Sequence, residues 1–157
     1  MILISACLLG YNCKYNGGNN FNPDLLKLLK NESFIPICPE QLGGLPTPRI
    51  ACEIQNATGD DVLLGKGKIY NKNGYDLTSL FVQGAKRTLI EAKKAGVNKA
   101  ILKSKSPSCG VNQIYDGSFT SKLKNGDGVT TALLKQSGIE VISAEDYIKG
   151  EKSNESN

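Results

Sequence analysis

The sequence of 157 residues contains no histidine, and this absence restricts the chemistry available to the protein. Histidine is the usual general acid or base near neutral pH and a common nitrogen ligand of zinc. Any proton transfer must therefore use Glu, Asp, Lys, Tyr, Ser, Cys or water. A site for a soft metal must be built from cysteine thiolates.

Long hydrophobic runs are also missing. No apolar segment approaches the roughly 18 to 20 residues that span a bilayer, so we expect a soluble protein with no membrane partner. Residues 1–10 are apolar, but no basic segment precedes them, and Ser5, Cys7 and Gly10 interrupt the run. These features argue against a signal peptide and lead us to expect a cytoplasmic location.

Dense positive charge is lacking as well, although the net charge is +4. The lysines are scattered, and no stripe of Lys and Arg alternates with aromatic residues as it does in many nucleic-acid-binding surfaces. We therefore expect no nucleic-acid partner. The length is that of one domain with a single core, and we expect a monomer or a homodimer.

Hydrophobic periodicity predicts strands that alternate with helices. Strands are expected at 2–5, 34–38, 99–104 and 140–146, the last running into a short helix. Helices are expected at 22–31, which is short, at 76–94, which is the longest, and at 128–138. Asn22 and Pro23 are suited to the start of the first helix, and Pro36 places the second strand at an edge. Weak strand signals at 61–65 and 66–71 fit a hairpin or a flap.

This order predicts the α/β fold class. Strands joined by helices pair in parallel through right-handed crossovers. We expect a three-layer, Rossmann-like domain over residues 1–149, with a mostly parallel open sheet and helices on both faces. Residues 150–157 are expected to form a polar, disordered tail.

The five cysteines include no Cys-x-x-Cys pair, and their odd number argues against a disulfide framework. A single buried cysteine is more often a small hydrophobic residue than a ligand. Cys7, Cys38 and Cys109, however, each follow a predicted strand, and ligands of parallel sheets bind beyond the carboxyl ends of strands. These three could therefore converge, in a spacing compatible with an iron–sulfur cluster. Cys13 and Cys52 fit a structural role better.

Other polar residues near these cysteines allow two interpretations each. Glu40, two positions after Cys38, is either a solvated carboxylate or a proton carrier at a strand end. The segment 104–110, SKSPSCG, is either a plain turn or a set of donors around its cysteine. Arg49 is either a surface charge or a fork for a carbonyl or an anion. The segment 125–134 predicts a helix start, because it lacks the full phosphate-binding pattern.

Four segments together resemble the DUF523 family, the domain of the thiouracil desulfidases: ISACLLGYNCKYNG, ICPEQLGGLPTPR, ILKSKSPSCG and NGDGVTTALLKQSGIEVI. The similarity extends from about residue 2 to residue 147, nearly the whole chain. It implies an oxygen-sensitive enzyme with a [4Fe-4S] cluster, held by three cysteines so that one iron stays open for the departing sulfur. The implied reaction removes sulfur from a thiolated pyrimidine without net redox chemistry, converting 2-thiouracil to uracil and hydrogen sulfide.

The resemblance also implies roles for individual residues. Matched motif by motif, the cluster ligands are Cys7, Cys38 and Cys109. Cys13 matches the family pattern too, whereas Cys52 does not.

For the reaction itself, Glu40 is the expected proton shuttle. A serine is expected to orient the base and the water, with Ser106 first and Ser104 or Ser108 as substitutes. Gly43 and Gly44 are expected to let the backbone approach the cluster or the substrate.

Two other functions are compatible with the sequence. One is a sulfur-relay or thiolation protein that uses the same open iron to load sulfide onto an acceptor. The other is a non-enzymatic iron–sulfur or zinc-binding module for sensing or storage. Release of sulfide from thiouracil without an acceptor separates the enzyme from both. The expected partners of the enzyme are small molecules: a thiolated base as substrate and hydrogen sulfide as product.

Overall fold

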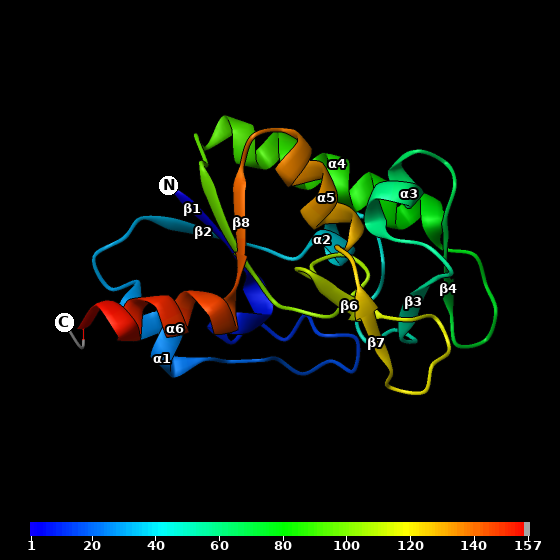
Figure 1. The fold of residues 1–157 in the computed structure, drawn as a ribbon, viewed down its shortest axis with the longest axis horizontal. Helices are drawn as coiled ribbons and strands as arrows, with labels where there is room; N and C mark the ends of the chain where they lie inside the picture. Colours follow the sequence, from blue (N-terminus) through cyan, green and yellow to red (C-terminus); the bar gives the residue numbers. More distant parts are fainter. Residues whose placement is uncertain (156–157) are drawn as a thin grey trace.

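The computed structural model describes residues 1–155, which form one parallel sheet and two small antiparallel ribbons (Figure 1). The strands of the sheet, in spatial order, are β2 (Phe34–Ile37), β1 (Ile2–Ser5), β5 (Lys99–Leu102) and β8 (Glu140–Ser143). All neighbouring pairs are parallel. Each strand lies where hydrophobic periodicity predicts one, and β2, which contains Pro36, is an edge strand as expected.

Helices cover both faces of the sheet, which confirms the predicted α/β fold with helices on both sides (Figure 1). Successive residues of a strand point to opposite faces. On one face, Leu3 packs with α4 (Thr78–Lys94) and α5 (Val129–Gln136). On the other face, Ile2 and Ile4 pack with α1 (Pro23–Leu28) and α6 (Ala144–Glu155).

A further hydrophobic cluster lies beside the sheet and includes Ile54, Phe81 and Ile114. Two antiparallel ribbons flank it: β3 (Cys52–Gln55) with β4 (Lys68–Asn71), and β6 (Gln113–Tyr115) with β7 (Leu123–Asn125). The strand signal at 66–71 predicts β4. The β6–β7 ribbon is not predicted, because its strands are short and lack a regular alternation of apolar and polar residues.

The strand predicted at 61–65 is wrong, because residues 61–63 belong to helix α3 (Gly59–Leu63). Thr58 caps the helix: its hydroxyl accepts the N–H of Asp61, and its own N–H donates to the Asp61 carboxylate at 2.9 Å. This reciprocal pair is a capping box. The Thr-x-x-Asp spacing was the sequence signal for a helix start.

Other helix ends follow their local signals closely. The Asn22 side chain accepts the N–H of Leu25 at 3.0 Å, and Pro23 is the first residue of α1, as predicted.

α6 extends to Glu155, into the segment 150–157 expected as a tail, and residues 156–157 lie outside the described residues. No helix within the described part of the chain has the length and apolar character needed to cross a membrane.

Candidate functional site

The carboxyl ends of three neighbouring strands each lead into a loop with a cysteine. Cys7 lies in a short 3-10 helix, η1 (Ala6–Leu9), directly after β1, and Cys38 is the N-cap of α2 (Pro39–Leu42), directly after β2. Cys109 follows β5, the neighbour of β1 on the other side. This is the switch point at which open parallel sheets bind ligands. A cavity of about 470 Å³ lies there and is lined by all three cysteines.

Cys13, interpreted from the sequence as a structural cysteine, lies between Cys7 and Cys38 and lines the same cavity. Hydrogen bonding from the Cys13 thiol, opposed in part by burial, lowers the pKa of Cys7 to about 6 and that of Cys38 to about 7. The Asn20 amide also donates to the Cys7 sulfur at 3.4 Å. The pKa of Cys13 is raised, because its hydrogen bonds to Cys38 and Cys7 hold its proton. The tertiary structure therefore assembles a cysteine trio that sequence spacing did not indicate.

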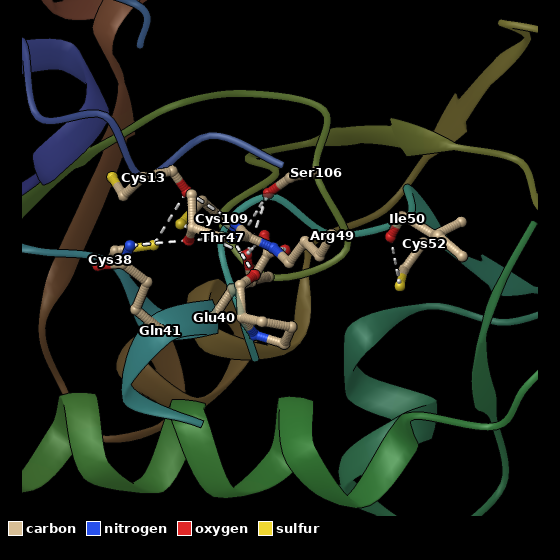
Figure 2. Close-up of polar contacts among 12 residues, drawn as sticks. Cys13, Cys38, Glu40, Gln41, Thr47, Arg49, Ile50, Cys52, Ser106 and Cys109 are labelled. Carbon is tan, nitrogen blue, oxygen red and sulfur yellow. Dashed lines mark hydrogen bonds and ion pairs between the residues drawn. The ribbon is translucent and has the colours of Figure 1, made fainter. Parts of the chain in front are cut away.

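Cys109 and Cys52 also line the cavity but differ from this trio. Burial raises the pKa of each to about 12. A hydrogen bond from Ser5, at the end of β1, acts in the opposite direction on Cys109. The Cys52 sulfur lies 3.5 Å from the carbonyl oxygen of Ile50, and Figure 2 shows it away from the labelled cysteines Cys13, Cys38 and Cys109.

Both carboxylate oxygens of Glu40 are engaged. Arg49 Nε donates to Oε1 at 3.0 Å, in an ion pair whose side chains are only 6% and 15% exposed for Arg49 and Glu40 (Figure 2). Ser108 Oγ donates to Oε2 at 2.8 Å. Glu40 is thus a positioned carboxylate at the cavity wall rather than a solvated one.

Arg49 acts as a fork, the second of its two interpretations. Besides the ion pair, its Nη2 donates to the carbonyl oxygen of Cys13 at 2.8 Å. Its Nη1 donates to the carbonyl oxygen of Pro46 at 3.2 Å and to the hydroxyl of Thr47 at 3.0 Å. One guanidinium therefore joins the Pro-rich turn, the Cys13 loop and the carboxylate of Glu40.

The loop 104–110 is fixed by the first residues of α5. The N–H of Thr130 donates to the carbonyl oxygen of Ser108 at 3.0 Å. A Cβ on Gly128 would lie 2.5 Å from the same oxygen, so only glycine allows this approach. The segment 125–134 contains a helix start, as predicted. The first N–H groups of a helix have no partner within the helix, and here they donate to the loop that carries Cys109.

The structure separates the serines that the sequence treated as interchangeable. Ser106 Oγ accepts the N–H of Cys109 at 2.8 Å and lies 3.2 Å from Ser108 Oγ. Ser104 Oγ donates to the Glu145 carboxylate, at the start of α6, at 3.1 Å. All three serines line the cavity, but among them Ser108 is the one that contacts the carboxylate described above.

Gly43 and Gly44 are not among the residues that line the cavity, so the interpretation of these glycines was wrong. A Cβ on Gly43 would lie 2.2 Å from the carbonyl oxygen of Leu80, and one on Gly84 would lie 2.1 Å from that of Pro39. These contacts let the backbones of α2 and α4 touch. Gly44 has φ of +94° and ends the α2 turn with open space around it. Gly43 and Gly84 therefore allow the turn to pack closely against α4.

A further part of the cavity wall was not predicted. It includes Glu53 of β3, together with Tyr115, Phe119 and Ser121 of the β6–β7 hairpin. Glu53 is 8% exposed, and its Oε1 accepts the N–H groups of Gly117 and Phe119 at 2.9 Å and 3.2 Å. A charged residue inside a strand-like apolar run was the one sequence signal for this wall.

The donor set suits an iron–sulfur cluster. Within residues 1–155, no group of three or more His, Cys, Asp or Glu side chains is placed to hold a single metal ion. Four cysteines from three separate loops instead surround a roomy cavity, and two of them have a lowered pKa. Cysteine thiolates are the usual ligands of iron–sulfur clusters.

Known proteins are similar to this chain in sequence and in fold. The family model described as 2-thiouracil desulfurase matches residues 2–146. The uncharacterized protein YbbK of Bacillus subtilis (strain 168) is 48% identical over 143 residues, which cover 91% of this chain and 95% of the relative. The solved structure of the [4Fe-4S]-dependent thiouracil desulfidase TudS (DUF523Vcz) matches with a TM-score of 0.79 and 38% identity, over 92% of this chain and 90% of that chain. The chain belongs to the 2-thiouracil desulfurase family.

Proposed function

We propose that the protein is a [4Fe-4S]-dependent desulfidase that converts 2-thiouracil to uracil and hydrogen sulfide. The proposal depends on one observation: loops after three neighbouring parallel strands bring four cysteines and Glu40 to one cavity. The name of the solved relative, a [4Fe-4S]-dependent thiouracil desulfidase, supports the same activity here. In this reaction the oxygen of water replaces sulfur on the ring carbon, both protons of the water leave with the sulfur, and no electron is transferred overall.

Cys7, Cys38 and Cys109 are the proposed cluster ligands. Cys7 and Cys38 have the lowered pKa values, and a thiol must lose its proton to become a ligand. Cys109 follows β5, the strand next to β1. Cys13 competes for the third position, because its thiol contacts both other sulfurs. When bound, such a cluster supplies an iron with an open position, which acts as a Lewis acid toward the thiocarbonyl sulfur.

Glu40 is the proposed proton carrier. It lines the cavity beside the cysteines, and it is an acceptor that Arg49 and Ser108 hold in place from two sides. In this role the carboxylate takes a proton from the attacking water and returns it to the leaving sulfur. These hydrogen bonds already restrict the Glu40 side chain, so less conformational entropy is lost when the reaction takes place.

Ser108 and Ser106 have different proposed roles. Ser108 orients the carboxylate through its 2.8 Å hydrogen bond to Glu40. Ser106 holds the Cys109 loop through the 2.8 Å hydrogen bond that it accepts from the Cys109 N–H. Ser104 is engaged by Glu145 at 3.1 Å and is placed outside the proton path. Orientation of the base and the water, the role expected for Ser106, stays a prediction.

The direct test is sulfide release without a sulfur acceptor. Protein reconstituted anaerobically with iron and sulfide is washed free of excess sulfide and incubated with 2-thiouracil, and uracil and hydrogen sulfide are measured together. We expect equal amounts of the two products. Cluster-free protein and zinc-loaded protein are the controls and should release neither product.

Two results would contradict the proposal. Turnover that appears only when a thiol acceptor is added would favour a sulfur-relay protein. A stable cluster with no release of uracil under any of these conditions would favour a non-enzymatic binding module.

A further inference from the structure

The carboxylate of Glu53 has one oxygen with two partners and one with none. Oε1 accepts the N–H groups of Gly117 and Phe119. Oε2 forms no hydrogen bond or ion pair with any residue that the structure describes. Among these residues, Thr130 Oγ1 is the only fully enclosed side-chain polar atom without a partner. Glu53 Oε2 therefore keeps some exposed surface, and Glu53 is one of the residues that line the cavity.

The environment of Glu53 makes this free oxygen unusual. The residue is 8% exposed and lies within β3, where a charged side chain is costly to bury unless it is hydrogen-bonded. No lysine or arginine lies within ion-pair distance of it in the described residues. Oε2 of this buried carboxylate is therefore left as a hydrogen-bond acceptor without a protein partner in the part of the chain that the structure describes.

Hydrogen bonds from the β6–β7 loop surround the same carboxylate. Gln55 Nε2 donates to the carbonyl oxygen of Gly117 at 2.8 Å, which adds a third hydrogen bond between β3 and this loop. A Cβ on Gly117 would lie 2.7 Å from the carbonyl oxygen of Ile54, so the loop backbone is in direct contact with the strand. Phe119 has φ of +57°, and it lines the cavity. The loop thus presents an aromatic side chain next to an open acceptor.

We propose that Glu53 Oε2 accepts a ring N–H of the substrate and thereby selects cyclic thioamides with an N–H beside the thiocarbonyl group. This inference rests on the proposed desulfidase function and names the substrate feature that the site reads. In 2-thiouracil an N–H flanks the thiocarbonyl carbon on each side. A hydrogen bond from one of them to a buried carboxylate is charge-assisted. It holds the ring in the cavity that Glu53 shares with the cysteines, and Phe119 forms part of the wall of this cavity.

Methylated substrates and one conservative variant test this assignment. On the wild-type protein, kcat/KM is compared for 2-thiouracil and for its N1-methyl and N3-methyl derivatives. We expect one of the two methyl groups to lower kcat/KM by about tenfold to a hundredfold, because it removes the hydrogen bond and leaves the carboxylate unpaired. Equal values for all three compounds would overturn the proposal, whatever the variants do.

Glu53→Gln keeps an oxygen for the Gly117 and Phe119 N–H groups but presents an amide N–H₂ to the cavity. We expect a higher KM for 2-thiouracil and a loss of discrimination against the methylated compound. Binding is read separately by equilibrium dialysis of uracil, which contains no sulfur to release, and should weaken about tenfold or more. Unchanged uracil affinity in the variant would overturn the proposal.

Gln55→Leu is the matched control. It removes the 2.8 Å hydrogen bond to Gly117 and leaves the Glu53 carboxylate intact. Discrimination between the methylated and unmethylated compounds should be retained. If Gln55→Leu loses it to the same extent as Glu53→Gln, Glu53 only positions the loop and the proposal is overturned. Iron content, measured for each protein, excludes cluster loss as the cause.

Failure of the proposed function gives a different result. Wild-type protein that releases no sulfide from 2-thiouracil contradicts desulfidase activity on this base. The uracil-binding comparison then still decides the role of Glu53: weaker binding by Glu53→Gln with normal binding by Gln55→Leu supports it, and equal binding overturns it.

Discussion

Ser108 Oγ lies 2.8 Å from Oε2 of Glu40, although 68 positions separate the two residues in the sequence. The hydrogen bond joins the loop that carries Cys109 to the short helix that follows Cys38. Arg49 holds the other oxygen of the same carboxylate at 3.0 Å. The proposed proton carrier and two proposed ligands are therefore parts of one connected network, and a change in one should affect the others.

Serine substitutions of single cysteines should identify the cluster ligands. Cys7→Ser and Cys38→Ser should abolish a reconstituted [4Fe-4S] cluster, because these are the thiols with lowered pKa. Cys52→Ser should retain it, since Cys52 belongs to β3 and lies away from Cys13, Cys38 and Cys109 (Figure 2). Iron and acid-labile sulfide analysis gives the answer.

The same series decides the third ligand. We expect Cys109→Ser to lose the cluster and Cys13→Ser to keep most of it. The opposite pattern would assign the third position to Cys13 and leave Cys109 as a buried core residue.

Glu40→Gln should remain folded and retain its cluster but release sulfide slowly. The amide preserves the shape and can still accept from Ser108, yet it cannot carry a proton. Loss of one general acid or base typically costs at least about a hundredfold in rate, which is about 3 kcal/mol in the barrier. Single-turnover sulfide release measures the effect. A rate close to that of the wild type would move the proton transfer to another group, and loss of iron would make Glu40 structural.

Ser108→Ala should slow turnover about tenfold or more, because Glu40 loses the hydrogen bond that fixes one of its oxygens. Ser104→Ala is the control, since its hydroxyl is engaged by Glu145 at 3.1 Å. It should have kcat and KM near those of the wild type. Steady-state kinetics at equal iron content compares the two variants, and equal effects of both would remove Ser108 from the proton path.

Gly43→Ala should destabilise the fold, whereas Gly44→Ala should have a smaller effect. The first variant would place a Cβ 2.2 Å from the carbonyl oxygen of Leu80, a backbone atom that cannot move alone. We expect a cost of about 3 kcal/mol or more, at the upper end for overpacking. At Gly44, with φ of +94° and open space, the cost is that of the backbone conformation, about 1 kcal/mol. Urea unfolding of both variants checks the order, and equal stabilities would contradict the tight contact between α2 and α4.

Much of the fold was predictable because its signals are local. Each signal depends on residues only a few positions apart. Examples are the Asn22 cap of α1, the helical spacing of apolar residues in α4, and the Ile and Leu residues of β1. The parallel arrangement follows from the order of strands and helices. The ribbon β6–β7 was not predictable in the same way, because short polar strands form only when a partner and a core cover them.

The sequence by itself determined the fold class, the family, and the delivery of Cys7, Cys38 and Cys109 to one edge of the sheet. These follow from periodicity and from the rule that parallel strands end at the same edge. Only the tertiary structure placed Cys13 between Cys7 and Cys38, and only it placed the Ser108 hydroxyl at the carboxylate of Glu40. Such side chains lie in loops, where position is set by hydrogen bonds between distant segments, as in the bond from Arg49 to the carbonyl oxygen of Cys13. A sequence pattern gives the spacing of residues along the chain, and it does not show which residues from distant segments come into contact.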